Sequence, residues 1–117
     1  MQRIEVTGEG ITVTEVIEPL LSRFGKEMRP GATFVYALPW DEISGVSLSA
    51  IELAPTGERW VDLTVDVSWG EYFEVHQDAE GFLEAVRALC RLSGFPVPGM
   101  ATLTMAGQAI WPGPKTA

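Results

Sequence analysis

The segment from Trp60 to Val67 alternates between apolar and polar side chains with high regularity. The apolar phase consists of Val61, Leu63, Val65 and Val67. The polar phase contains Asp62, Thr64 and Asp66. A strand with this period of two buries one face in a core and leaves the other in water. The pattern therefore predicts an antiparallel sheet with one solvated face, and it limits how the neighbouring segments can fold.

Other segments also read as strands. Residues 3–14 alternate on both sides of a glycine-containing turn at Gly8–Gly10, which predicts a β-hairpin. We further expect strands over Thr33–Leu38, Val46–Leu53 and Tyr72–His76, the last with Phe73 and Val75 on its buried side. The apolar positions of Val46–Leu53 change phase after residue 50, which predicts a bulge or a bend between two sheets.

The segment Val16–Gly31 has two interpretations. Pro19 is a suitable first residue for a short helix that ends at Gly25. A long strand followed by an irregular loop fits the same residues nearly as well.

A helix is predicted over residues 78–93. Asp78 is a suitable N-cap, and Gly94 with Pro96 would end the helix. Its apolar stripe consists of Phe82, Leu83, Val86, Leu89 and Cys90. We expect a single domain over residues 1–96 and a partly flexible C-terminal extension over residues 97–117, with a short strand at 101–105.

The order of elements predicts an α+β, mainly β fold: an antiparallel curved sheet or open barrel closed by one C-terminal amphipathic helix. The run Leu38-Pro39-Trp40-Asp41-Glu42-Ile43-Ser44-Gly45-Val46, with the later strands and a helix starting Asp78-Ala79-Glu80-Gly81-Phe82, resembles bacterial pleckstrin-homology-like domains. The resemblance covers about residues 3–94. It implies a barrel plugged by the helix, and a binding scaffold more than a particular chemistry.

The charge is strongly negative. Sixteen acids against eight bases give −8, and the window from Pro30 to Val86 holds eleven acids with Arg59 as its only base. This charge disfavours adhesion to nucleic acid and to anionic membranes. One cysteine excludes an internal disulfide, and no apolar run is long enough to span a membrane. We therefore expect a cytoplasmic protein with no cofactor and no metal.

The sequence offers little for catalysis. His76 is the only histidine, and we expect it to interact with nearby acids. Cys90 lies on the apolar stripe of the predicted helix, where a thiol packs as a small hydrophobe. No phosphate-binding loop, dinucleotide fingerprint, zinc spacing or nucleophile elbow is present. The sequence therefore predicts a protein that is not an enzyme.

The candidate partner-binding residues are two tryptophans and three acids: Trp60, Asp62, Asp66, Trp69 and Glu74. Exposed aromatic rings beside carboxylates suit a protein surface or a cationic ligand. Two plainer interpretations stay open. In one, the acids serve only to keep the protein soluble; in the other, the tryptophans cover the second face of the sheet beneath residues 16–31.

These observations favour a non-catalytic binding module that contacts a protein partner, with an immunity-type protein against a basic toxin as a specific form. The alternative is a carrier or sensor of a small apolar ligand held between barrel and helix. A further alternative is lipid headgroup recognition, which requires a basic pocket. The oligomeric state is not predicted.

Overall fold

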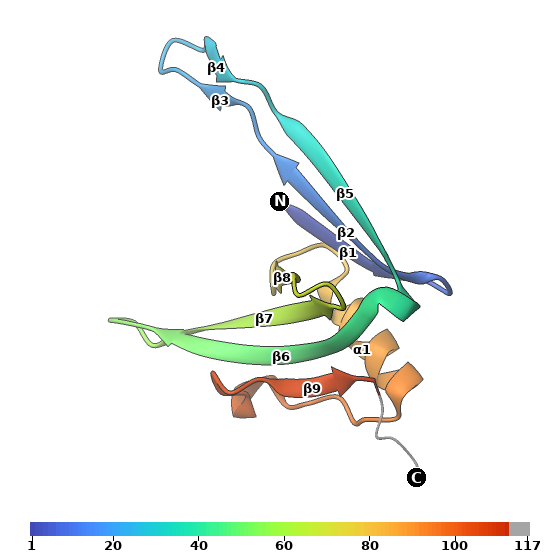
Figure 1. Ribbon diagram of the computed structural model, residues 1–117. Coiled ribbons are helices and arrows are strands. Elements are labelled where there is room, and N and C mark those ends of the chain that lie inside the picture. The colour runs from blue at the N-terminus through green and yellow to red at the C-terminus, as the bar shows by residue number, and fades with distance from the viewer. Residues whose placement is uncertain (113–117) are drawn as a thin grey trace.

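The computed structural model describes residues 1–112 of the 117-residue chain (Figure 1). One sheet has the order β1-β2-β5, and a larger sheet has the order β8-β7-β6-β9. The strands of the first sheet are β1 (Gln2–Val6), β2 (Gly10–Ile17) and β5 (Ala32–Pro39). Those of the second are β6 (Ile43–Leu53), β7 (Glu58–Val67), β8 (Tyr72–His76) and β9 (Gln108–Trp111). A two-stranded hairpin of β3 (Leu20–Leu21) and β4 (Glu27–Arg29) completes the strands.

The helical elements are the helix α1 (Phe82–Ser93) and two short 3-10 turns, η1 (Trp40–Glu42) and η2 (Met100–Thr102). All pairings between the named strands are antiparallel, and the sheets do not close into a barrel. The predicted fold class, a mainly β protein with a curved sheet and one helix, is confirmed. The resemblance to pleckstrin-homology-like domains stays a prediction.

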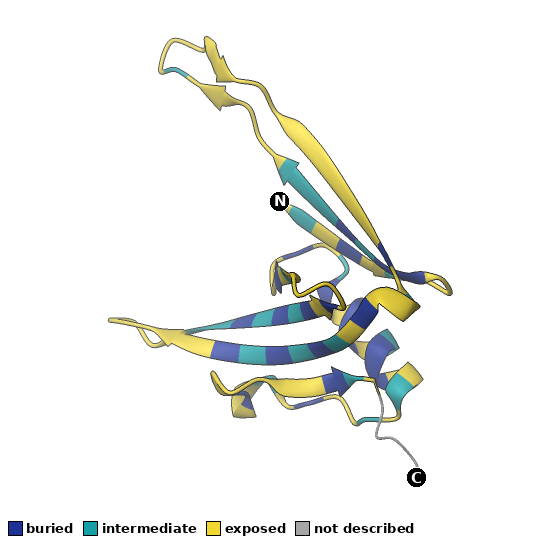
Figure 2. Ribbon diagram, in the orientation of Figure 1, coloured by how far each residue is buried: buried dark blue, intermediate teal, exposed yellow. Residues whose placement is uncertain are grey.

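One core lies between the two sheets and α1. Buried and less buried residues alternate along β6 and β7, as Figure 2 shows. The predicted inward phase of β7 is confirmed, since Leu63 and Val65 are fully buried. The first sheet contributes Ile4, Ile11 and Val13 to the same core. The helix contributes Phe82, Ala85, Val86, Leu89 and Cys90.

The helix begins later than the sequence predicts. Its N-cap is Gly81 in the left-handed region, at φ 82°, so the prediction that Asp78 caps it is wrong. Glu80, the residue before Gly81, instead pairs with β1: the Ile4 N–H donates to its carbonyl, and its own N–H donates to the Gln2 carbonyl, both at 2.9 Å. Leu83 is exposed although it was predicted on the apolar stripe. The predicted end of the helix at Gly94 is confirmed, at φ 84°.

Residues 17–31 form an arm that projects from the body of the molecule (Figure 1). The short helix considered for this segment is absent: β2 continues to Ile17, and β3 and β4 pair across a turn around Gly25. The Ser22 hydroxyl accepts from the backbone N–H groups of Phe24 and Lys26 and so holds this turn. The radius of gyration is 16.3 Å, against about 13 Å for a compact chain of this length.

The irregularity of β6 lies elsewhere than predicted. Its pairing with β7 shifts register between Ile43 and Gly45, and it is regular through Ala50 and Ile51. The predicted bulge after residue 50 is therefore wrong. Ile51 and Leu53 simply point away from the core, and both are partly exposed.

Residues 97–112 belong to the same core as the rest of the fold. β9 pairs with β6, and both Ile110 and Leu103 are buried. The predicted strand at 101–105 is replaced by η2 and the chain that follows it. These residues thus pack where the sequence led us to expect an extension, and residues 113–117 lie outside the described part. Within residues 1–112, no helix combines the length and the apolar character needed to cross a membrane.

Candidate functional site on the outer sheet face

The outward side chains of β7 and β8 from Trp60 to His76 form one surface, which we call the outer face. Its members are Trp60, Asp62, Thr64, Asp66, Tyr72, Glu74 and His76. The antiparallel register places Asp62 opposite His76, Thr64 opposite Glu74, and Asp66 opposite Tyr72. Three of these seven side chains are acids, and none is lysine or arginine. Arg59 is the only lysine or arginine within the hairpin of residues 58–76; its side chain lies on the inward side and donates to the carbonyls of Met100 and Leu103.

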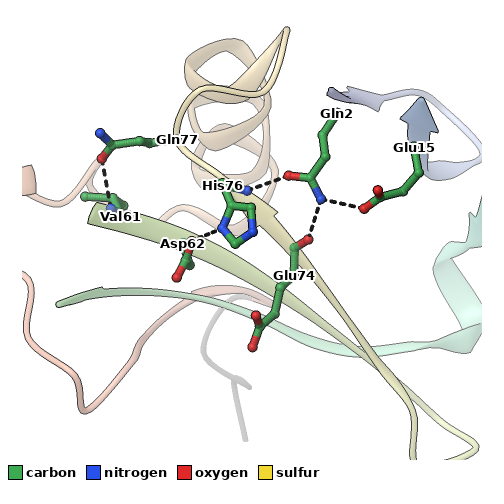
Figure 3. A network of polar contacts seen from close by, with 7 residues as sticks. All are labelled: Gln2, Glu15, Val61, Asp62, Glu74, His76 and Gln77. Atoms are coloured by element: carbon green, nitrogen blue, oxygen red, sulfur yellow. Dashed lines mark hydrogen bonds and ion pairs between the residues drawn. The ribbon is translucent and has the colours of Figure 1, made fainter. Parts of the chain in front are cut away.

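His76 and Asp62 interact directly across the two strands. The imidazole Nδ1 contacts a carboxylate oxygen of Asp62, as Figure 3 shows. This hydrogen bond is the largest influence on His76 and raises the pKa of its imidazole above the usual value, although partial burial opposes it. The carboxylates of Asp78 and Glu74 raise the pKa further. The predicted interaction of His76 with nearby acids is confirmed.

Gln2 fixes the free edge of β8. Its side-chain oxygen accepts from the His76 N–H, and its Nε2 donates to the Glu74 carbonyl, both at 2.9 Å (Figure 3). The same Nε2 donates to Glu15 at 2.7 Å. The Gln2 amide thus hydrogen-bonds two backbone groups of β8 that would otherwise need a neighbouring strand. It also links the outer face to the first sheet.

An open hollow of about 330 Å³ lies at one end of the outer face. Its lining consists of Ile51, Leu53, Trp60, Asp62, His76 and Asp78. β8 ends at His76, so the half-buried Trp60 has no strand partner on that side. Trp60 is flanked on one side by Ile51, its partner in β6, and on the other by the chain that follows β8. We call this place the Trp60 hollow.

Besides His76, which was expected only to interact with nearby acids, three lining residues of this hollow were missed from the sequence. Asp78 was predicted to cap the helix, and Ile51 and Leu53 were predicted to lie beyond a bulge. The phase change of the apolar residues in β6 contained the signal. Two large apolar residues at outward positions of a strand can indicate an apolar patch on its outward face as well as a bulge.

The other candidate residues lie toward the opposite end of the hairpin. Trp69 is half exposed in the turn between β7 and β8, and Asp66 is exposed. The seven residues of extended strand between Trp60 and Val67 span roughly 23 Å. The structure therefore brings Trp60 and Asp62 together, and it places Trp69 and Asp66 far from them. Glu74 lies between the two groups, opposite Thr64.

The four tryptophans do not lie beneath residues 16–31. Trp40 packs against Trp111 with ring centroids 5.0 Å apart, and its indole N–H donates to the Gly8 carbonyl. Trp60 and Trp69 are on the hairpin of β7 and β8, whereas the arm extends away from the body (Figure 1). The interpretation that the arm covers the tryptophans is wrong, because β2 and β5 carry it outward.

The geometry of the outer face bears on its chemistry. Ser49 of β6 lies opposite Asp62, which lies opposite His76, so the carboxylate is between the hydroxyl and the imidazole. Nucleophilic catalysis needs the imidazole between the other two groups. Cys90 is buried, and its burial raises the pKa of the thiol. Within residues 1–112, no group of three or more histidine, cysteine or acidic side chains is placed to hold a metal ion.

Comparison with family models, with curated proteins and with solved structures gives no match for this chain.

Proposed function

We propose that this protein is a non-catalytic binding module whose outer face takes a basic segment of a protein partner. The observation that supports the proposal is the Trp60 hollow, whose lining brings together an aromatic ring and two carboxylates. Asp62 and Asp78 both line it, and Ile51 and Leu53 provide apolar walls. A lysine or arginine side chain suits such a place, since its stem packs on apolar groups and its charge lies over the ring.

The charge of the surrounding surface supports the same partner. Asp66 and Glu74 extend the negative potential along the hairpin, with no lysine or arginine among the outward side chains. A negative surface of this kind raises the rate at which a basic protein associates. Occlusion of a basic toxin by an immunity-type protein is one form of this function. The exposed ring of Trp69 is a second contact at the far end of the hairpin.

His76 gives the binding a pH dependence. When the imidazole is protonated, it occupies Asp62 and neutralises part of the charge that the partner would meet. When it is neutral, the full charge of Asp62 is available to the ligand. Because Asp62 raises the pKa of His76, binding of a basic segment should strengthen as the pH rises through that raised value.

The proposal can be tested by site-specific cross-linking. A photoreactive phenylalanine analogue placed at position 60 or 69 is irradiated in lysate of the native host, and the cross-linked proteins are identified by mass spectrometry. The same analogue at Leu83, an exposed position on α1, is the control. We expect one basic protein to be captured from positions 60 and 69 and not from 83.

The captured protein is then titrated against the Trp60→Ala, Asp62→Asn and Leu83→Ala variants. We expect the first two to bind it at least tenfold more weakly, which corresponds to about 1.4 kcal/mol, and the third to bind as the wild type does. An acidic or neutral partner, or equal binding by all variants, would contradict the proposal.

A second candidate function rests on a different hollow. About 290 Å³ of open space lies between β7 and the beginning of α1, with Phe82, Leu83 and Met100 in its lining. It suits the alternative considered from the sequence, a small apolar ligand held between barrel and helix. Fluorescence of an apolar naphthalene sulfonate dye that rises with the wild type and not with Leu83→Arg would support it.

A further inference from the structure

The outer edge of β5 has no strand partner within residues 1–112, because β5 is the last strand of the order β1-β2-β5. The outer edges of β1 and β8 are covered. The chain near Glu80 bonds to β1, and the Gln2 side chain bonds to β8. The edge of β5 is eight residues long and carries no charged residue. Natural proteins usually protect such an edge with charge, proline or a covering segment.

The faces of β5 are also exposed along most of its length. Phe34, Val35 and Tyr36 are all exposed, and Leu38 is the only buried residue of the strand. The arm beyond it adds exposed Leu20, Leu21, Phe24 and Met28. This much apolar surface on a projecting element is typical of a surface that another chain covers.

We propose that β5 pairs antiparallel with β5 of a second copy of this chain and forms a closed, two-fold symmetric dimer. The two-fold axis would pass near Val35, so that Val35 meets its own copy. Phe34 would then lie opposite Tyr36 of the second copy, and the reverse pair would form on the other side of the axis. Cross-strand aromatic pairs of this kind stabilise sheets. The two three-stranded sheets would become one sheet of six strands.

Charge complementarity is the reason to choose a second copy as the occupant. The turn at the tip of the arm, Ser22–Arg29, carries three bases, Arg23, Lys26 and Arg29, against one acid. At the other end of β5, Asp41 and Glu42 in η1 carry two negative charges, and the Trp40 N–H donates to the carbonyl of Glu9. Antiparallel pairing brings the basic tip of each copy to the acidic end of the other.

The register about Val35 makes this match specific. It aligns Arg29 of one copy with Asp41 of the other, and symmetry repeats the contact at the second arm. Proline lies at both ends of the strand, at Pro30 and Pro39, and limits how far the pairing can slip. This inference does not depend on the proposed function, because no residue of β5 lines the Trp60 hollow.

The first test measures the mass in solution by sedimentation equilibrium. We expect the wild type to have twice the 12.8 kDa mass of the chain at micromolar concentration. Val35→Lys should return it to the monomer mass, since two lysines would face each other at the axis. Val97→Lys is the matched control, because Val97 is also an exposed valine and lies between α1 and η2, outside β5 and the arm, and it should stay dimeric. A monomeric wild type, or chains longer than two copies, would overturn the proposal.

The second test traps the register. Cα atoms of directly opposed residues in an antiparallel pair are about 4.5–5.5 Å apart, within the range a disulfide spans. Val35→Cys should therefore form a covalent dimer under mild oxidation, whereas Val97→Cys should not. The native Cys90 is buried and gives no background. Equal cross-linking of the two variants would contradict pairing about Val35.

The third test uses charge reversal. Arg29→Glu and Asp41→Arg should each weaken the dimer by about tenfold, because every dimer holds the contact twice. The double variant restores opposite charges and should recover most of the lost affinity. Failure of the double variant to recover would show that these two residues do not meet across the interface.

Discussion

The contact between His76 and Asp62 predicts a stability that depends on pH. The folded-state pKa of His76 is raised, so the contact stabilises the fold fully below the unfolded value of 6.5. This contribution is lost as the pH rises through the raised value. Asp62→Asn should therefore lower the free energy of unfolding more at pH 6 than at pH 9. Both side chains are partly exposed, so the difference should be about 0.5 kcal/mol.

Urea unfolding at the two pH values measures this difference. The control is the same substitution in a His76→Gln background, where no imidazole is present to titrate. There the cost of Asp62→Asn should be equal at pH 6 and pH 9. A pH dependence that persists without His76 would assign the effect to another group near the hairpin.

Leu63 tests the packing of the four-stranded sheet on the core. Its side chain is fully buried between β7 and the other core elements. Leu63→Ala should cost roughly 2–5 kcal/mol of unfolding free energy through lost transfer and a new cavity. Leu83→Ala, at an exposed leucine of α1, should stay within about 0.5 kcal/mol of the wild type. Chemical denaturation of both variants would contradict this packing if their losses were equal.

At the scale of elements, the start of α1 depends on a glycine. Gly81 has φ 82°, and a Cβ placed there would lie 2.4 Å from the carbonyl oxygen of Ile4 in β1. Gly94, which ends the same helix, has φ 84° but meets nothing within 4 Å. Gly94→Ala should thus lower the free energy of unfolding by only about 1 kcal/mol, the energy that a residue with a Cβ needs to adopt the left-handed conformation. Gly81→Ala should cost clearly more, since β1 must also shift.

Thermal unfolding of the two alanine variants checks this prediction. The comparison removes the contribution of the backbone conformation, which is nearly the same at both positions. Equal losses in melting temperature would mean that β1 can shift near Ile4 at little cost in free energy. In that case the link between the first sheet and the helix would be weaker than the hydrogen bonds of Glu80 indicate.

The elements that could be predicted from the sequence are those whose neighbours lie close along the chain. β7 was predicted in detail, because the alternation of apolar and polar residues along the strand shows which side chains point inward. The hairpin of β1 and β2 was predicted from its turn. The arm was not, because the apolar residues of Val16–Gly31 give no sign that they stay exposed. Burial depends on what lies opposite in space, and that information is not local.

The candidate site was only half predicted for the same reason. Trp60 and Asp62 were placed on the outward phase of one strand, which the structure shows. Their real neighbours Ile51 and Asp78 come from β6 and from the loop before α1, and the register of three segments decides that they meet. The sequence also grouped Trp60 with Trp69, although the length of β7 keeps them apart.

At the scale of the whole molecule, charge is separated along an elongated shape. The molecule measures 62 × 37 × 25 Å, and the arm forms one end of it (Figure 1). Residues 17–31 hold three bases and two acids, so the arm has a net charge of +1 and all the excess negative charge is on the rest of the chain. Opposite potentials at two ends favour oriented encounters with a basic partner or with a second copy. This separation gives the last prediction, which concerns rates.

Replacing Asp62, Asp66 and Glu74 by Asn, Asn and Gln removes charge from the outer face without changing its shape. Association with the captured basic partner should slow by about tenfold at low salt, and the difference should vanish in high salt, because exposed charges steer only when they are unscreened. Trp60→Ala should instead speed dissociation, since a ring buried at an interface typically contributes about 2 kcal/mol or more. Surface-plasmon kinetics at two salt concentrations separate the two effects. A triple variant that associates as fast as the wild type at low salt would show that the acids of the outer face serve only solubility and do not steer the partner.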